Sequence, residues 1–285
     1  MKLSIAIADT NALLSAFVVY RGFDTCIPKA ANLGFSGVEL ALRRADEINP
    51  SKLQRMLDDN NLEVSCISTG QVYADGGFAI THEDNIKRQQ AITIFKELID
   101  VGSEFGRMVN IGRVRGMIGK RNKQEVEDLF TEVARELSDY ALQKQVALVL
   151  EPINRYEIDF INNLMAGANL LKRINRSNMG LMPDLFHMNI EDYSIIEAIT
   201  DVISDVRYIH VADSNRLAPG NGHIDFESVF MHLQALRYNG WVCAEILPIP
   251  SPDIAARQAA DFLLPVIESY NREYQLRQDM VVTFS

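Results

Sequence analysis

Short aliphatic runs alternate with longer segments of mixed polarity along the whole chain. The run 146–150 consists of five consecutive apolar residues, which is typical of a parallel strand covered on both faces. Runs of this kind predict eight strands, at residues 2–9, 37–41, 62–68, 107–112, 145–151, 179–184, 206–212 and 240–246.

The segments between these runs carry apolar residues at the spacing of an amphipathic helix. In 122–144 the apolar positions recur three and four residues apart, and Asn122 with Glu125 can cap the start of the helix. Two further helices are predicted at 81–105 and 254–270. Eight strands alternating with about eight helices form a parallel sheet, and eight units favour its closure. We therefore predict a single-domain (β/α)₈ TIM barrel over all 285 residues.

The active site of such a barrel forms at the carboxyl ends of its strands. The last four predicted strands each carry an ionisable residue near that end: Glu151, Asp184, His210 and Glu245. Taken singly, each acid could cap a helix or pair with an arginine, but three carboxylates at one mouth repel each other unless a cation lies among them. A set of oxygen and nitrogen ligands without thiolates suits Mn²⁺, Mg²⁺ or Co²⁺ better than structural zinc, and we expect Mn²⁺.

Further polar residues follow these strand ends at short distances. Glu157 comes six residues after the first ligand, His187 three residues after the second, and Arg216 six residues after the third. A turn-rich loop over 218–225 could close over a ligand. Taken singly, each of these residues is a weak signal, since a histidine after a strand often has a structural role.

The composition narrows the class of protein. Hydrophobic residues make up 47% of the chain, which allows a large core, and the net charge of −10 argues against nucleic acid as a partner. Three widely spaced cysteines without a CxxC motif argue against a disulfide framework and suit a reducing compartment. We find no apolar run long enough to cross a bilayer and no signal peptide, so we expect a cytoplasmic protein that acts on a small molecule.

Three motifs resemble the xylose-isomerase-like barrel superfamily, and within it the ketose 3-epimerases. They read Glu151-Pro-Ile-Asn-Arg-Tyr-Glu157, Pro183-Asp-Leu-Phe-His-Met-Asn189 and His210-Val-Ala-Asp-Ser-Asn-Arg-Leu-Ala-Pro-Gly-Asn-Gly-His223. The resemblance implies the same four metal ligands that the strand ends indicate. It also implies substrate contacts from Glu157, His187 and Arg216, and it leaves a homo-oligomer open.

A narrower resemblance links the chain to bacterial epimerases of keto-sugar acids, which act on 5-keto-L-gluconate and D-tagaturonate. It rests on the stretches Ser68-Thr-Gly-Gln-Val-Tyr73, Thr81-His82, Ile111-Gly-Arg-Val-Arg-Gly116 and Leu247-Pro-Ile-Pro250. A sugar acid needs a cation for its carboxylate. Arg115 is the first candidate, followed by Arg113 and Lys120 in the same loop, although a solvated basic loop explains these residues equally well.

Epimerisation next to a ketone requires that a proton leave carbon and return on the opposite face. A metal chelated by the substrate would stabilise the enediolate, and two bases would flank the substrate plane. We assign these acid/base roles to Glu151 and Glu245, which are also ligands. His187 and Arg216 would hold oxygens near the carbonyl, and Glu157 a hydroxyl or hydroxymethyl end.

Three alternatives remain open at this point. An aldose–ketose isomerase of the hydroxypyruvate isomerase type shares the chemistry and differs in the carbon that is reprotonated. An abasic-site endonuclease of the same superfamily needs further histidines at earlier strand ends, where this chain has Ser68 and the stretch 110–112. A non-catalytic barrel would leave the four clustered ligands without a purpose.

Overall fold

The computed structural model describes residues 1–13 and 16–283, with side chains described up to residue 275. Its strands form one sheet in which every recorded pairing between strands is parallel. The strands are β1 (Lys2–Ala8), β2 (Tyr20–Arg21), β3 (Gly37–Ala41), β4 (Glu63–Ser68), β5 (Met108–Ile111), β6 (Ala147–Leu150), β7 (Met179–Leu181), β8 (Tyr208–Val211) and β9 (Trp241–Ala244).

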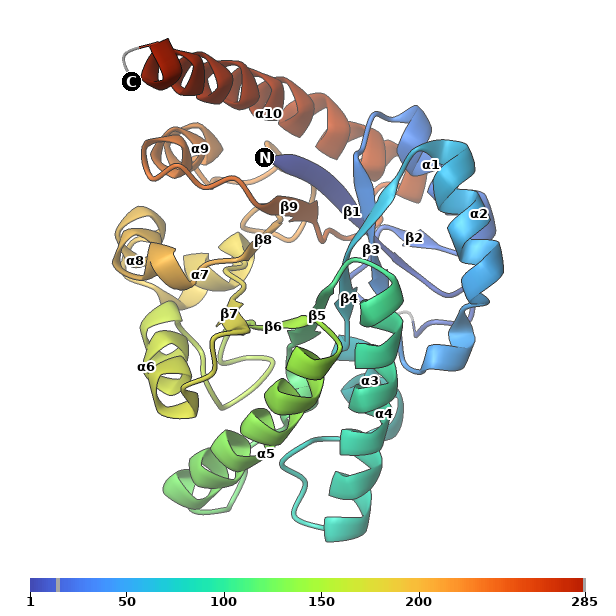
Figure 1. Ribbon diagram of the computed structural model, residues 1–285, viewed down its shortest axis with the longest axis vertical. Helices are drawn as coiled ribbons and strands as arrows, with labels where there is room; N and C mark the ends of the chain where they lie inside the picture. The colour runs from blue at the N-terminus through green and yellow to red at the C-terminus, as the bar shows by residue number, and fades with distance from the viewer. Residues whose placement is uncertain (14–15, 284–285) are drawn as a thin grey trace.

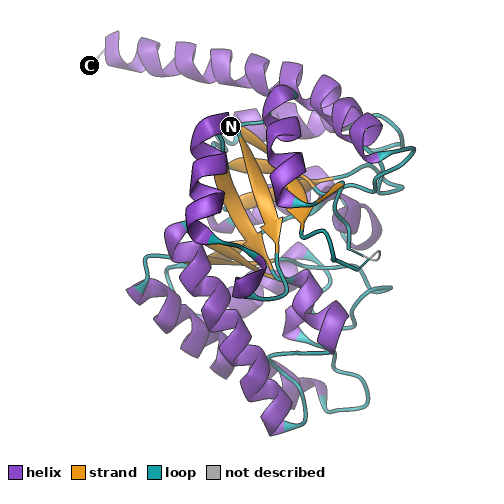
Figure 2. Cartoon of the chain, turned by 90° about the vertical axis from the view of Figure 1, so that its right-hand side faces the viewer, coloured by secondary structure: helices purple, strands orange, loops and turns teal. Residues whose placement is uncertain are grey.

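Helices cover the outside of this sheet. Figure 1 shows the helices around the strands, and Figure 2 shows the same arrangement after a turn of 90°. The helices are α1 (Phe23–Asn32), α2 (Pro50–Asn60), α3 (Gly70–Gly76), α4 (Asn85–Glu104), α5 (Lys123–Gln143), α6 (Leu164–Ile174), α7 (Leu185–Glu191), α8 (Ile195–Val202), α9 (Phe226–Ala235) and α10 (Pro252–Thr283). Single 3₁₀ turns lie at Ala45–Glu47, Arg113–Arg115 and Ile203–Asp205.

The sheet is a nearly closed barrel. The strand order is β7-β6-β5-β4-β3-β1-β9-β8, with the short β2 paired to β1. Two isolated parallel bridges, Leu181 with Val206 and Asp184 with His210, join the β7 and β8 sides of the gap. The second bridge lies at the carboxyl end and links two of the predicted ligands directly. The predicted (β/α)₈ barrel is confirmed.

Two apolar clusters hold the barrel together. The larger one fills the space between strands and helices, where residues such as Phe130 of α5 are fully buried and each contributes roughly 1.5–3 kcal/mol. The smaller one lies among inward-facing positions and includes Cys66, Met182 and Tyr208. The hydroxyl of Tyr208 is satisfied there by Ser65 at 2.7 Å, as a buried polar group requires.

All eight predicted strands are present, with ends that differ by a few residues. The predicted helix at 122–144 is α5, and Asn122 caps it by accepting from the backbone N–H of Gln124 at 2.8 Å. The helix predicted from residue 81 begins only at Asn85, because the Thr81 hydroxyl donates to the Arg115 carbonyl and Asp84 caps the first turn.

The last helix, α10, continues well beyond the predicted end at residue 270. No helix in the described part of the chain combines the length and the apolar character that a membrane span needs.

Candidate functional site

The four predicted ligands meet at the carboxyl end of the barrel. Glu151 directly follows β6, Glu245 directly follows β9, and His210 lies within β8. Asp184 precedes α7, where its carboxylate accepts a hydrogen bond from the backbone N–H of Phe186 at 2.8 Å. It therefore caps a helix and faces the site at once. One ligand atom from each of the four side chains lies within 4.8 Å of the others.

Two buried polar atoms in this cluster, Asp184 Oδ2 and His210 Nδ1, have no hydrogen-bond partner among the described residues. His210 Nδ1 lies 3.4 Å from Glu151 Oε1 and 4.0 Å from Glu245 Oε2, and all of these side chains are almost fully shielded from solvent. Buried polar atoms without a partner are rare, because leaving them unpaired is costly. Their convergence on one point, with a donor set of oxygens and one imidazole nitrogen, fits a divalent cation.

The electrostatics of the cluster point the same way. Burial raises the pKa of Glu245 to about 8 against the attraction of His210 and Arg216, and it also raises the pKa of Asp184. Burial opposes ionisation of Glu151 too, but the close approach and the positive charge of His210 outweigh it and lower the pKa of Glu151 to about 2. The side chains around Asp184 and Glu245 therefore do not fully offset the cost of burying these two carboxylates as anions, and a cation at the cluster would do so.

Two supporting residues were missed by sequence reasoning. Glu39, within β3, is fully buried and its Oε2 lies 2.9 Å from His210 Nε2, which leaves Nδ1 to face the cluster. Asn110, within β5, donates to Glu151 Oε2 at 2.8 Å. Histidine ligands in metal sites commonly bind a carboxylate through their other nitrogen, and this contact fixes the ring. The signal in the sequence was a charged residue inside the otherwise apolar run 37–41.

His187 extends from the first turn of α7 toward the same cluster. Its Nδ1 lies 3.4 Å from the backbone N–H of Asn154 and 2.7 Å from the Asn154 side-chain amide. The backbone donor makes Nδ1 an acceptor, so the proton of a neutral ring sits on Nε2, which lies 3.6 Å from Asp184 Oδ2. Burial and the charge of Arg216 hold the pKa of His187 well below its usual value. His187 is thus a neutral hydrogen-bond donor at the cluster.

The loop after β8 carries Arg216 into the same site, where its Nη2 lies 3.8 Å from Asp184 Oδ2. Asp213 organises this loop: its carboxylate accepts from the backbone N–H of Ser214 at 2.7 Å and of Gly220 at 2.8 Å. Arg216 itself has a left-handed backbone with φ of 62°, a costly conformation for a residue other than glycine. Its guanidinium donates to Glu157 at 3.0 Å and to Glu245 at 2.5 Å.

Two aromatic rings hold this guanidinium in place. Its central carbon lies 3.7 Å from the centre of the Phe17 ring and 4.6 Å from that of Phe186. Stacking of this kind suits the planar guanidinium, which binds oxygens through its edge. Arg216 and Glu157, both predicted as substrate contacts, therefore lie together at the site.

Arg115 corrects the sequence interpretation. It was the first candidate for binding a substrate carboxylate, but its side chain is fully buried. Its guanidinium donates to the backbone carbonyls of Phe160, Gly112, Glu151 and Ile161 at 2.8 to 3.0 Å. With these bonds made, Arg115 is a structural residue that ties the loops after β5 and β6 together.

A cavity lies over the cluster at the barrel mouth. Among the residues that line it are Glu151, Glu157, His187, Arg216 and Glu245, together with Phe17, Gln71 and Arg113. Cys66 is not among them, because it is fully buried in the inner cluster.

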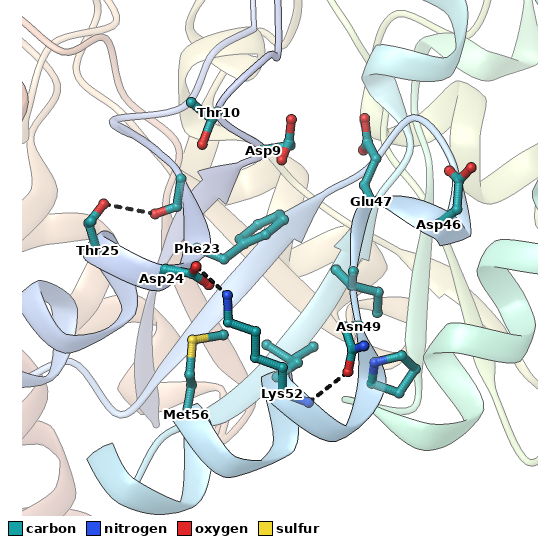
Figure 3. Close-up of a pocket in the computed structure, with 14 residues that line it drawn as sticks. Asp9, Thr10, Phe23, Asp24, Thr25, Asp46, Glu47, Asn49, Lys52 and Met56 are labelled. Atoms are coloured by element: carbon teal, nitrogen blue, oxygen red, sulfur yellow. Dashed lines mark hydrogen bonds and ion pairs between the residues drawn. The ribbon is translucent and has the colours of Figure 1, made fainter.

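A second hollow lies beside the mouth, between the loop after β1 and the starts of α1 and α2 (Figure 3). It is rich in carboxylates, but three of them, Asp9, Asp24 and Glu47, are paired with basic side chains. Lys52 points at Asp24 across the hollow, and Arg43 binds Glu47 and Asp9. The clustered unpaired ligand atoms described above lie in the barrel mouth and not here.

Comparison with known proteins places these findings in a family. Residues 27–266 match the model of the xylose isomerase-like TIM barrel. A probable ketose 3-epimerase of Synechocystis sp. is 26% identical over 79% of each chain, and an L-ribulose 3-epimerase of Methylomonas sp. is 27% identical over 79% of this chain and 78% of its own.

A solved structure shares the fold at lower identity. A D-allulose 3-epimerase from Methylomonas sp., in complex with D-allulose, superimposes with a TM-score of 0.80 at 21% identity, covering 93% of this chain and 96% of its own. On the family match, the barrel topology and the arrangement of the site, the chain belongs to the xylose isomerase-like TIM barrel family.

Proposed function

We propose that the chain is a divalent-metal-dependent sugar epimerase that inverts the carbon next to the ketone of a ketose or keto-sugar acid. The observation that carries this proposal is the convergence of Glu151, Asp184, His210 and Glu245 within 4.8 Å at the barrel mouth. The named relatives, which are ketose 3-epimerases, support the same chemistry. The proposal includes keto-sugar acids because of the narrower resemblance to epimerases of 5-keto-L-gluconate and D-tagaturonate.

A divalent cation held by the four ligands, Mn²⁺ by our expectation, would polarise the substrate carbonyl and stabilise the charge that develops on its oxygen. Glu151 and Glu245 follow β6 and β9, with β7 and β8 between them around the ring. Carboxylates so separated can flank a substrate plane. We assign one of them to take the proton from carbon and the other to return a proton to the opposite face.

The other site residues orient the substrate in this proposal. The Nε2 proton of His187 and the guanidinium of Arg216 donate hydrogen bonds to substrate oxygens near the carbonyl. Glu157 accepts hydrogen bonds from Arg216 and, at 3.1 Å, from Asn154. In this proposal it also accepts a hydrogen bond from a hydroxyl of the substrate. Phe17 and Phe186 keep Arg216 in the plane that this requires.

Glu151→Gln and Glu245→Gln test the assignment. Each should lower the rate of exchange of substrate hydrogen with deuterated solvent by about 10²- to 10⁴-fold, the usual contribution of a positioned acid or base. The exchange is followed by NMR on a panel of ketoses and keto-hexonates with Mn²⁺, and bound manganese is measured in each variant. Removal of metal by EDTA should lower the rate, and added Mn²⁺ should restore it.

Glu191→Gln is the matched control, because Glu191 is a carboxylate near the mouth that is paired with Arg155 at 2.8 Å. It should retain the exchange rate. Retention of near-normal rates by both site variants would exclude the acid/base pair. If deuterium from the solvent appeared in an aldose product instead of at the inverted carbon of a ketose, the activity would be that of an aldose–ketose isomerase and not of an epimerase.

A further inference from the structure

Arg113 is a second arginine that lines the cavity, and its guanidinium is not paired with any described residue. It lines the same cavity as Glu151, Glu157 and Arg216, and it is half-buried. No described residue accepts a hydrogen bond from its guanidinium or forms an ion pair with it. By contrast, Arg216 is engaged by Glu157 and Glu245. The guanidinium nitrogens of Arg113 are not among the buried polar atoms that lack a partner, so they are open to the cavity and available to a bound group.

The position of Arg113 is built into the fold. It opens the 3₁₀ turn after β5, whose last residue, Arg115, is anchored by its four bonds to backbone carbonyls. The guanidinium carbon lies 5.5 Å from the centre of the Phe17 ring, whose ring also contacts Arg216. Arg113 is therefore held at the cavity by an anchored turn and an aromatic ring, and no described residue binds its donors.

A second unused group lies near the same side of the cavity. Gln71, in α3 after β4, is almost fully buried and donates through Nε2 to the carbonyl of Ala41 at 3.0 Å, while its Oε1 has no partner among the described residues. Arg113 and Gln71 follow β5 and β4, whereas the ligand cluster comes from β6 to β9. The cavity thus has a side that carries the ligand cluster, after β6 to β9, and a neighbouring side, after β4 and β5, with a cation and an acceptor that no described residue binds.

The charge of the site indicates what Arg113 binds. Apart from Arg113, the charged side chains that line the cavity among the described residues are three carboxylates, Glu151, Glu157 and Glu245, and the guanidinium of Arg216. A neutral sugar needs no further cation, but an anionic substrate would be repelled unless one lay near its charged end. The planar guanidinium matches the oxygens of a carboxylate or a phosphate.

We propose that Arg113 binds an anionic group, a carboxylate or a phosphate, at the end of the substrate remote from the ligand cluster. The preferred substrates are then keto-sugars charged at that end, and Arg113 is a specificity-determining residue. This inference rests on the proposed function, since it assigns the far end of the substrate whose ketone lies at the cluster.

The test compares three sugars with one carbon skeleton: D-tagatose, D-tagaturonate and D-tagatose 6-phosphate. Hydrogen exchange in the Mn²⁺-loaded enzyme gives kcat and KM for each. Arg113→Ala should raise KM for the preferred anion and lower its kcat/KM by about 10- to 100-fold, the effect of losing one charged hydrogen-bonding partner. It should change kcat/KM for D-tagatose by less than about twofold, and Arg113→Lys should recover part of the loss.

Lys120→Ala is the matched control, because Lys120 is an exposed cation of the same loop that lines a different hollow. It should leave all three sugars unaffected. The comparison of D-tagaturonate with D-tagatose 6-phosphate separates the carboxylate from the phosphate. Preference of the wild type for D-tagatose over both anions, or an equal loss for all three sugars in Arg113→Ala, would overturn the proposal.

A binding measurement separates this inference from the proposed function. If the wild type exchanged hydrogen with none of the sugars, the epimerase assignment would fail, and calorimetry would then compare D-gluconate with D-glucitol, which differ in the charged end. Tighter binding of D-gluconate that is lost in Arg113→Ala supports an anion site. Equal binding of both compounds, or no effect of the substitution, refutes it.

Discussion

Glu39 offers the sharpest test of how the barrel prepares its ligand cluster. Its carboxylate is fully buried and contacts Nε2 of His210 at 2.9 Å, so that the opposite ring nitrogen faces Glu151 and Glu245. We expect Glu39 to orient the imidazole and to increase its basicity as a ligand. Glu39→Gln keeps an acceptor in place but removes the charge, whereas Glu39→Ala removes the contact altogether.

The expected loss follows from this difference. Partners of ligating histidines are worth about 10- to 100-fold in metal affinity, or about 1.4–2.8 kcal/mol. Glu39→Gln should lie near the lower end, since a neutral acceptor still holds the ring. Glu39→Ala should lie near the upper end, since it also leaves a buried ring nitrogen without a partner. Competition between the folded protein and a chromophoric chelator for Mn²⁺ measures both values.

Ser65→Ala serves as the control for this measurement. Ser65 is also buried inside the barrel, but its hydroxyl bonds to Tyr208 at 2.7 Å and to Ser4 at 2.9 Å rather than to His210. It should bind Mn²⁺ with the wild-type affinity. The reasoning fails if both Glu39 variants, shown to be folded by circular dichroism, bind Mn²⁺ within about twofold of the wild type.

Three further predictions follow from buried groups outside the ligand cluster. Arg115→Met should lower the free energy of unfolding by about 3 kcal/mol or more, because it strands buried carbonyls, while Arg113→Met should change it by less than about 1 kcal/mol in urea denaturation. Burial favours the protonated form of Asp213, but backbone N–H donors outweigh it and lower the pKa of Asp213 below 3.8. The wild type should therefore have a higher free energy of unfolding than Asp213→Asn above pH 3.8, and this difference should disappear as the pH falls through the lowered pKa. A difference that stays unchanged at acid pH would contradict this. Burial raises the pKa of the Cys66 thiol well above 9.0, and peptide mass spectrometry should find Cys66 unmodified by a thiol reagent until denaturant is added.

The barrel and the four residues that converge at its mouth could be predicted because both depend on local pattern. An apolar run in the sequence predicts each strand. Closure of the parallel sheet brings the carboxyl ends of all strands to one mouth, so Glu151 and Glu245 could be placed there from their positions alone. Asp184 was found by the same rule, although β7 ends at Leu181 and the residue lies in the segment that follows. Glu39 was missed because its role depends on a histidine far along the chain.

The two arginines of the turn after β5 show that a sequence predicts the chemistry of a side chain more readily than the direction in which that side chain points. Arg113 and Arg115 have the same side chain and stand two residues apart, and we predicted Arg115 ahead of Arg113 as the anion-binding residue although composition does not separate them. The 3₁₀ turn directs them to different surroundings: Arg115 reaches the carbonyls of the loop after β6, and Arg113 reaches the cavity. These roles are also linked, because the bonds of Arg115 fix the turn from which Arg113 extends. A substitution at Arg115 should therefore impair folding, whereas one at Arg113 should alter the choice of substrate.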